Sequence, residues 1–256
     1  MNVRLEKGAG IAVLTLDRPD RLNAMNDPMW EALCAHLGAI AADEQIRAVI
    51  LTGAGRAFCS GGDVAAMRQS DLVTGRARSR LRHRAVLALY NLEKPVIAAV
   101  RGPVYGIGNA LALVCDLVVA SDTAKFSMAF KKVGVVPDGG AVFFLTQYLG
   151  IGRAKDLVYT ARVVPAEEAL QLGLVVRVVP DHELEAQARA LAAELAESAT
   201  YALALAKKMF HGMYLPTLEQ LLETEALASG LARLTHDHKE GVDAFKEKRP
   251  PKFLGK

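Results

Sequence analysis

The sequence predicts an α/β fold, and three observations support this class. Short runs rich in β-branched residues alternate with longer segments of helical periodicity through the first half of the chain. Several of these runs are bounded by glycine or proline, which is typical of buried strands. The chain has 256 residues, of which 52% are hydrophobic, so it is long enough to bury one large core. Alternating strands and helices favour a sheet that is covered by helices.

The expected elements of the first half follow in chain order. Strands are predicted at 11–17, 47–53, 95–100, 116–122 and 125–130, and helices at 28–43, 79–94 and 108–115. Pro28 suits the first turn of its helix because Asn26 and Asp27 precede it as capping residues. The segment 68–80 is polar, and we expect it to form a mobile loop.

The pattern changes in the second half. Helices are predicted at 141–150 and 153–161, and nearly everything after 175–180 is helical. We therefore divide the chain near residue 198, into a core with the functional site (1–197) and a C-terminal helical segment (198–256). The last helices are apolar on one face, so they are expected to cover the core or a neighbouring subunit.

Composition excludes several classes of protein. The net charge is only +3 and its charges are interspersed, so no nucleic-acid-binding stripe is expected. We expect no signal peptide and no membrane span, because no apolar window is long enough. Cys34, Cys59 and Cys115 are few and widely spaced, which indicates free thiols in a reducing cytoplasm rather than disulfides or a metal site. Cys59 is expected to be a small buried hydrophobic residue.

Two glycine-rich turns, at 55–67 and 101–116, are the strongest candidates for a site. Each follows a predicted strand and precedes a helical segment, so unpaired backbone N–H groups gather there. Two N–H groups aimed at one point can stabilise a developing oxyanion. Either turn alone is explained more simply as a chain reversal, but the recurrence of the pattern favours a paired site.

Other common motifs fail or are absent. The stretch after the strand at 47–53 begins like a dinucleotide fingerprint, but Phe58 occupies its third glycine position. The sequence has no phosphate-binding loop, no GxSxG elbow and no HExxH. His83, His236 and His238 lie among charged residues, and we expect them on solvated helix faces.

Asp138 is the acidic residue of the stretch VGVVPDGG, which spans residues 133–140. It could cap the helix that follows, because Asp is favoured at that position. It could also act as an acid or base in catalysis, and the two roles are compatible. Apolar neighbours are expected to raise its pKa above the ~3.9 of a free aspartate, which would make it a better base.

Five stretches in order resemble the crotonase, or enoyl-CoA hydratase/isomerase, superfamily. They are RPDRLNAM, AFCSGGDVAAM, KPVIAAVRGPVYGIGNALALVCDLVVAS, AKFSMAFKKVGVVPDGG and KEGVDAFKEKRPPKFLGK. The resemblance implies a spiral of ββα units with C-terminal helices, assembled as a homotrimer or a hexamer. It also implies an acyl-CoA thioester substrate and no metal or other cofactor.

The resemblance also implies the site residues. The oxyanion hole would be the backbone N–H groups of Gly62 and Ile107. The residues bordering CoA would be Arg21, Asn23, Ala24, Ser60, Gly61, Asp63 and Val64. We expect Asp63 to cap a helix as well, and Asp116 to have a structural role.

The chain departs from the hydratases that it resembles at two positions. Those enzymes use two glutamates, and the matching residues here are Ala110 and Phe130, neither of which can exchange a proton. At position 138 hydratases have glycine, whereas isomerases of the phenylacetate-degradation type have a similar aspartate. The resemblance therefore implies an isomerase of enoyl-CoA or of a ring-epoxide acyl-CoA. A hydratase with a different water-activating set and a non-catalytic CoA-ester-binding protein are the alternatives.

Overall fold

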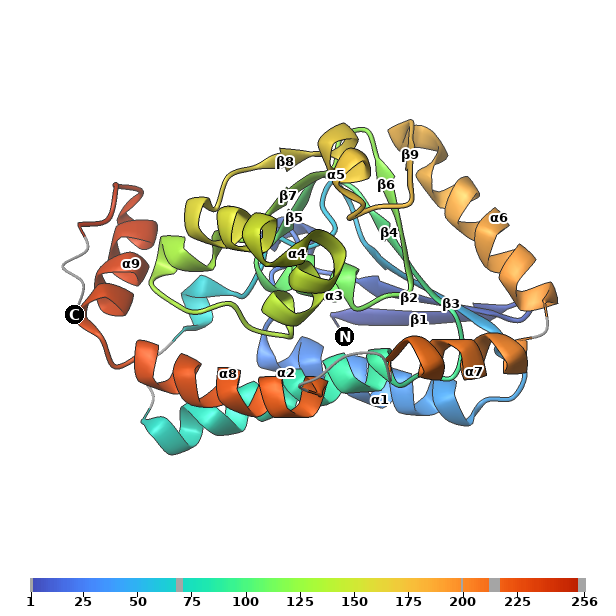
Figure 1. The fold of residues 1–256 in the computed structure, drawn as a ribbon, viewed down its shortest axis with the longest axis horizontal. Helices are drawn as coiled ribbons and strands as arrows, with labels where there is room; N and C mark the ends of the chain where they lie inside the picture. Colours follow the sequence, from blue (N-terminus) through green and yellow to red (C-terminus); the bar gives the residue numbers. More distant parts are fainter. Residues whose placement is uncertain (1, 68–70, 199, 212–216, 253–256) are drawn as a thin grey trace.

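The computed structural model describes residues 2–67, 71–198, 200–211 and 217–252 (Figure 1). Its largest feature is a six-stranded sheet, which a smaller three-stranded sheet accompanies. The strands of the larger sheet, in spatial order, are β1 (Val3–Gly8), β2 (Ile11–Leu16), β3 (Ala48–Gly53), β4 (Val96–Val100), β6 (Leu117–Ser121) and β9 (Arg177–Val179). The smaller sheet contains β5 (Pro103–Tyr105), β7 (Lys125–Ser127) and β8 (Val164–Pro165).

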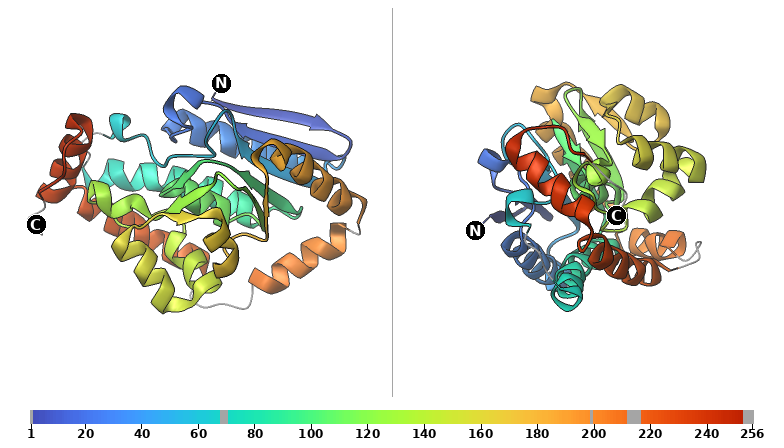
Figure 2. Two further views of the ribbon diagram at one scale, coloured as in Figure 1. Left: turned by 90° about the horizontal axis from the view of Figure 1, so that it is seen from above. Right: turned by 90° about the vertical axis from the view of Figure 1, so that its left-hand side faces the viewer.

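Helices cover both faces of the larger sheet and extend to one end of the molecule (Figures 1 and 2). They are α1 (Asp27–Ala42), α2 (Leu72–Tyr90), α3 (Ile107–Leu113), α4 (Ala141–Thr160), α5 (Ala166–Leu172), α6 (Leu184–Glu197), α7 (Thr200–His211), α8 (Leu218–Ala232) and α9 (His236–Glu247). In both figures α9 lies at the end of the molecule opposite α6, and α8 packs along α2.

The topology repeats a three-element unit. β1 is antiparallel to β2, and the other pairs of the larger sheet are parallel. In the succession β4, β5, α3 and again in β6, β7, α4, a strand of the larger sheet is followed by a strand of the smaller sheet and then by a helix. The predicted α/β class with ββα units is thus confirmed.

Strand periodicity explains how β2 serves two cores. Ala12, Leu14 and Leu16 belong to the main core, which α1, α2, α3 and α4 complete. Ile11 and Val13 belong to a second cluster, which α6 covers on the opposite face. Successive side chains of a strand point to opposite faces, so a strand covered on both faces must be apolar throughout.

The start of α1 follows the sequence signals, whereas α2 does not. The Asn26 side chain accepts a hydrogen bond from the Met29 N–H at 3.1 Å, and Pro28 lies in the first turn. The expectation of a polar loop over 68–80 is wrong for 71–80, because α2 begins at Leu72 with Asp71 as its cap. Residues 68–70 lie outside the described residues.

Other differences from the predicted elements are local. Strands β1 and β5 and helix α5 were not expected, and only 125–127 of the predicted strand at 125–130 is extended. A short 3-10 helix (Ala129–Val133) follows instead. The two helices predicted over 141–161 form the single element α4, which is kinked at Gly150, where φ is 73° and ψ is 162°. Only a residue without a Cβ adopts this backbone at low cost.

Helix α7 is joined to the sheet by an ion pair. The ammonium group of Lys207, which is buried, lies 2.9 Å from a carboxylate oxygen of Asp116 at the start of β6. The same oxygen accepts a hydrogen bond from the Val96 N–H at 2.8 Å. Burial raises the pKa of Asp116, and Lys207 opposes that rise. The expected structural role of Asp116 is therefore supported by its contacts.

We expect Lys207→Met to reduce the free energy of unfolding by about 3 kcal/mol, since it leaves the Asp116 carboxylate without its cation. The double variant D116N/K207M is expected to lose less, because it removes both charges. Urea denaturation measures both values. Lys208→Met, on the exposed side of the same helix, is the control and should change stability by less than about 1 kcal/mol. Equal losses in the single and double variants would contradict this assignment.

Candidate active site

A cavity of about 640 Å³ opens beside the two glycine-rich turns. Both turns line it, together with the start of α1, one face of α2, the segment from Ala129 to Asp138, and parts of the C-terminal helices. The lining residues that matter below are Asp27, Gly61, Gly62, Asp63, Arg78, Arg82, Gly106, Ile107, Phe130, Asp138 and Arg233.

Backbone hydrogen bonds join the two turns to each other. The Cys59 N–H donates to the Pro103 carbonyl at 3.0 Å, and the Tyr105 N–H donates to the Cys59 carbonyl at 2.9 Å. A Cβ atom on Gly106 would lie 3.9 Å from the Cα of Gly61. The sequence prediction that these turns form one site is consistent with this pairing, because the ladder brings both chain reversals to the same wall of the cavity.

The N–H groups of Gly62 and Ile107 are available at this wall. Ile107 is the first residue of α3, so its N–H has no partner within the helix. Within the described residues, neither N–H donates a backbone hydrogen bond. Both N–H groups are therefore free to donate hydrogen bonds to an oxygen atom, and the positive end of α3 favours negative charge on that oxygen.

Glycine is required where the turns meet. Gly106, which precedes α3, has φ of 52° and ψ of −120°, a backbone conformation outside the reach of ordinary side-chain-bearing residues. At Gly108 a Cβ atom would lie 2.5 Å from the Cys59 carbonyl oxygen, so any side chain there would push the two turns apart. The glycines thus permit the backbone contact on which the site depends.

Asp138 lies at the same cavity and is 7% exposed. One carboxylate oxygen accepts the Gly139 N–H at 2.7 Å and lies 3.2 Å from Nε2 of His83. The other oxygen lies 2.8 Å from Nε of Arg82. The carboxylate is therefore held on three sides by α2 and by its own loop.

These contacts reverse the predicted direction of the Asp138 pKa. Burial alone raises the pKa, but the charge of Arg82, the contact with His83 and the Gly139 N–H together lower it well below the usual range. The prediction of a raised pKa is wrong because it considered only apolar neighbours close in sequence. Arg82 and His83 are more than fifty residues away along the chain and could not be placed by pattern alone. Asp138 is thus ionised at neutral pH.

Two further expectations about this loop and helix are corrected. Asp138 does not cap α4, because Gly140 occupies the N-cap position and no side chain caps that helix. His83 is not solvated: it is 5% exposed and lies behind the Asp138 carboxylate. The basic sequence around His83 predicted a solvent-exposed helix face. Arg82 and His83 instead both contact the buried carboxylate of Asp138.

Gly139, in the VPDGG stretch, allows the loop before α4 to lie close to the start of α3. Its φ is +69°, and a Cβ atom there would lie 2.3 Å from Cδ1 of Ile107 and 3.4 Å from Cβ of Ala110. A side chain at 139 would therefore collide with the start of α3. The bare backbone at this point lets Asp138 sit next to the residue whose N–H faces the cavity.

Other carboxylates of the cavity are engaged elsewhere. Asp63 accepts hydrogen bonds from Arg18 at 3.0 Å and from the Ala65 N–H at 3.1 Å, and its role as a helix cap is confirmed. The Asp27 side chain is 48% exposed. Among the described lining residues, Asp138 is therefore the buried carboxylate, and Phe130 and the neighbouring Ala110 offer none.

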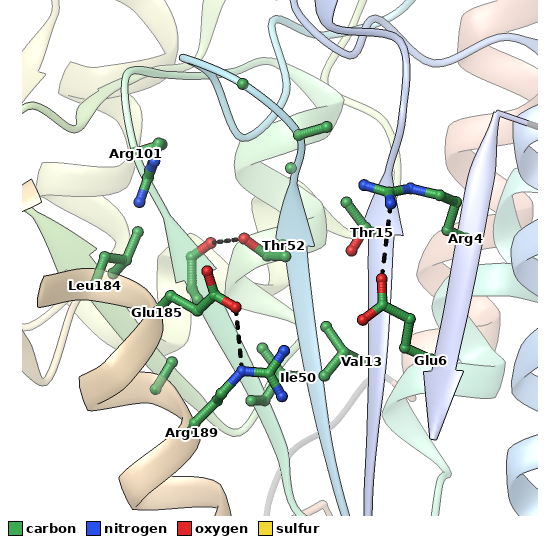
Figure 3. A pocket seen from close by; sticks show the side chains of 15 residues that line it. Arg4, Glu6, Val13, Thr15, Ile50, Thr52, Arg101, Leu184, Glu185 and Arg189 are labelled. Atoms are coloured by element: carbon green, nitrogen blue, oxygen red, sulfur yellow. Dashed lines mark hydrogen bonds and ion pairs between the residues drawn. The ribbon is translucent and has the colours of Figure 1, made fainter. Parts of the chain in front are cut away.

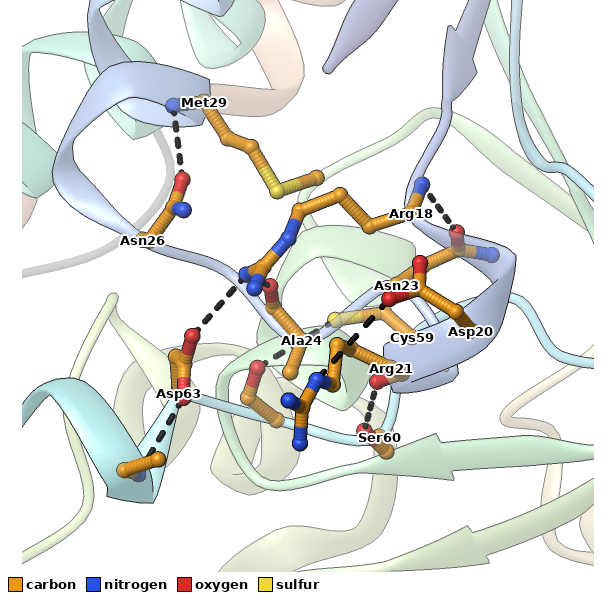
Figure 4. A network of polar contacts seen from close by, with 12 residues as sticks. Arg18, Asp20, Arg21, Asn23, Ala24, Asn26, Met29, Cys59, Ser60 and Asp63 are labelled. Atoms are coloured by element: carbon orange, nitrogen blue, oxygen red, sulfur yellow. Dashed lines mark hydrogen bonds and ion pairs between the residues drawn. The ribbon is translucent and has the colours of Figure 1, made fainter.

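The residues expected to border CoA divide into two groups, and Figure 4 shows the polar contacts around several of them. Those of the first glycine turn line the cavity: Ser60, Gly61, Asp63 and Val64. Those of the RLNA stretch do not: Arg21, Asn23 and Ala24. Arg21 is exposed, so its contact with CoA stays a prediction.

Asn23 has an evident structural task, and its place beside CoA, like that of Ala24, stays a prediction. It is fully buried, and its side chain donates to the carbonyls of Ala54 and Ala57 at 2.9 and 2.7 Å and accepts from the Arg18 N–H at 2.8 Å. All its polar groups are thereby used to hold the loop before α1 against the first glycine turn. Its φ of 56° suits asparagine, which tolerates the left-handed region.

The remaining candidate residues do not form a second reactive site. Cys59 is fully buried, as predicted, and burial raises the pKa of its thiol to about 12. His236 is exposed, but His238 is buried and its Nδ1 lies 2.9 Å from the Val133 carbonyl oxygen, so its predicted solvation is wrong. Within the described residues no cluster of three potential metal ligands occurs. None of the helices in those ranges has the length and hydropathy to span a lipid bilayer.

Comparisons with known proteins agree with this geometry. A family model described as Enoyl-CoA hydratase/isomerase matches residues 6–256. A probable enoyl-CoA hydratase of Rhodobacter capsulatus is 40% identical over 254 residues, which are 99% of this chain and 98% of that protein. The 1,2-epoxyphenylacetyl-CoA isomerase of Escherichia coli is 40% identical over 253 residues, with 96% of each chain covered.

A solved structure shows the same architecture. The crystal structure of an enoyl-CoA hydratase from Mycobacterium avium subsp. paratuberculosis superimposes with a TM-score of 0.91 and 32% identity, over 99% of each chain. This confirms the crotonase-like fold that the motifs predicted. The chain therefore belongs to the enoyl-CoA hydratase/isomerase family.

Proposed function

We propose that this protein is an acyl-CoA isomerase that moves a carbon–carbon double bond, with Asp138 as its acid and base. The observation that supports isomerisation most directly is the set of carboxylates at the cavity. Asp138 is buried there. By the resemblance described above, Ala110 and Phe130 occupy the positions of the two hydratase glutamates. Relatives of equal identity are named hydratase and isomerase, so their names do not favour either activity.

The proposed reaction transfers one proton. The Asp138 carboxylate removes a proton from C2 of a 3-enoyl thioester, and the electron pair of that C–H bond delocalises over the thioester and the C3–C4 double bond. The N–H groups of Gly62 and Ile107 stabilise the negative oxygen of the resulting dienolate. Asp138 then returns the proton to C4, which leaves the double bond between C2 and C3. An epoxide of an aryl-acetyl thioester is the other substrate type that this site could isomerise.

The local contacts of Asp138 suit part of this task. Its lowered pKa keeps it in the basic form at neutral pH. The same stabilisation makes it a weak base, so the oxyanion donors must lower the pKa of the C2 proton to make the transfer feasible. Arg82 therefore sets how readily Asp138 accepts the proton.

Asp138→Asn is expected to reduce kcat for 3-enoyl-CoA isomerisation by about 100-fold or more, because the amide cannot accept a proton. The dissociation constant for a saturated acyl-CoA should change by less than about threefold, since the thioester oxygen is bound by backbone groups. Ultraviolet absorbance of the conjugated product measures the first quantity and calorimetry the second. A variant with the wild-type rate would refute the assignment.

Arg82→Met is expected to raise the pKa of Asp138, because burial persists while the cation is lost. In the wild type, protonation of Asp138 should not lower kcat/KM between pH 7 and about pH 5. In the variant, kcat/KM should begin to fall at a higher pH than in the wild type. The profile is also measured with His83→Gln, because His83 is the other side chain that contacts the Asp138 carboxylate. Arg84→Met, an exposed change on the same helix, is the matched control. An unchanged acidic limb in Arg82→Met would contradict the role of Arg82.

Water addition is expected to be the minor activity, because the described residues that line the cavity include no second buried carboxylate beside Asp138. With 2-butenoyl-CoA, the loss of conjugated absorbance should be at least about 100-fold slower than isomerisation of a 3-enoyl-CoA of suitable chain length. Faster hydration than isomerisation across a panel of 2-enoyl, 3-enoyl and aryl-acetyl thioesters would instead identify a hydratase. No turnover with any member of the panel would indicate a protein that only binds CoA esters.

A further inference from the structure

Three arginines gather on one wall of the main cavity. Arg78 and Arg82 are four residues apart on α2, so they share a face of that helix, and both line the cavity. Arg233 lines the cavity from the end of α8, which packs along α2. Like charges at this spacing repel each other, so the cluster lowers the stability of the free protein unless an anion accompanies it.

The carboxylates at this wall do not neutralise the cluster. Arg82 is paired with Asp138 at 2.8 Å. Arg78 lies 3.6 Å from Asp27, whose side chain is about half exposed. Arg233 forms no ion pair with any described residue, although Arg82 and Asp138 are near enough to affect its charge. Three cations thus face two anions, and one cation lacks a direct partner.

A donor group of Arg233 is also unused. Its Nε atom is buried and has no hydrogen-bond acceptor among the described residues. Burial and the neighbouring arginines lower the pKa of Arg233 to about 10, so it remains a cation at neutral pH. Buried charged donors without acceptors are destabilising, and a bound anion would remove that penalty.

A second cavity, drawn in Figure 3, differs from the main cavity in how its arginines are paired. It is about 230 Å³ in volume and lies between α6 and the larger sheet, and it also contains three arginines. There, however, each arginine has a carboxylate of the chain as its partner: Arg4 with Asp17 at 2.9 Å, Arg101 with Asp181 at 3.4 Å, and Arg189 with Glu185 at 3.2 Å. The main cavity therefore differs from this second cavity in that one of its arginines, Arg233, has no carboxylate partner among the described residues.

The position of the cluster indicates which part of a substrate it meets. Arg82 touches Asp138, which lies next to the start of α3 and hence beside the thioester position of the proposed reaction. Arg78 shares the helix face of Arg82, and both of these arginines are near enough to Arg233 to affect its charge. An anion bound by Arg78 and Arg233 is therefore a group on the acyl chain.

We propose that the preferred substrate is a dicarboxylic acyl-CoA, whose free carboxylate is bound by Arg233 and Arg78. A guanidinium presents two parallel N–H donors, which match the two oxygens of a carboxylate. The proposal rests on the proposed function only for the place of the thioester. It specifies the class of acyl group that the site accepts.

The test is a comparison of dissociation constants for saturated thioesters, which do not turn over. Adipoyl-CoA is paired with hexanoyl-CoA, and suberoyl-CoA with octanoyl-CoA, in calorimetric titrations of the full chain. The wild type should bind at least one diacid about tenfold or more tightly than its matched monoacid. Arg233→Gln and Arg78→Gln should each abolish most of this preference and change the binding of the monoacids by less than about twofold.

Arg80→Gln is the matched control, because Arg80 lies on the same helix with a side chain that is 63% exposed and is not among the cavity-lining residues. It should leave every dissociation constant unchanged. Circular dichroism verifies that each variant is folded, and Arg78→Gln decides the question if Arg233→Gln is unfolded. No preference for diacids in the wild type would overturn the proposal. An equal loss for diacids, monoacids and free CoA in the variants would overturn it as well, since the arginines would then bind a phosphate of CoA.

The two proposals fail in different ways. Turnover is measured separately with the 3-enoyl forms of the same monoacid and diacid thioesters. A preference for saturated diacids without any isomerisation would refute the proposed reaction while supporting the carboxylate site. Isomerisation of monoacids with no preference for diacids in binding or kcat/KM would do the opposite.

Discussion

The close approach of backbone segments at glycine is the constraint on which the site depends. Gly108 lets α3 lie against Cys59, and Gly139 lets the loop before α4 lie against Ile107. Each contact places a functional group of one segment beside that of another without an intervening side chain. The sheet and helices set the general position of these segments. The short distances between them at the cavity are possible because glycine has no Cβ atom.

The sequence predicted the parts of the protein that depend on local patterns. Buried strands such as β2 and β3, the capped start of α1 and the glycine turns all have short-range signals. The ordered motifs also indicated the family and the place of Asp138. Helix α2 was predicted to start too late because its first turns are polar, and its cap, Asp71, is the one local signal that could have corrected this.

The electrostatic state of the site could not be predicted from local patterns. The pKa of Asp138 depends on Arg82 and His83, which approach it only after α2 packs against the core. Asn23 is a similar case, because its side chain donates to two carbonyls of a loop more than thirty residues away and accepts from the Arg18 N–H. The residue type suggested possible roles in both cases, but the partners are brought together only by the fold.

The walls of the cavity differ in how freely evolution can alter them. The wall formed by the two glycine-rich turns is made of backbone atoms held by the hydrogen bonds between the turns, so a side chain at Gly106 or Gly108 would disturb the main chain. A second wall is formed by side chains on α2 and near the end of α8, whose helical hydrogen bonds do not depend on which side chains face inward. New acyl groups could therefore be accommodated by exchanging a few residues on the helical wall, with the reactive half of the enzyme inherited intact.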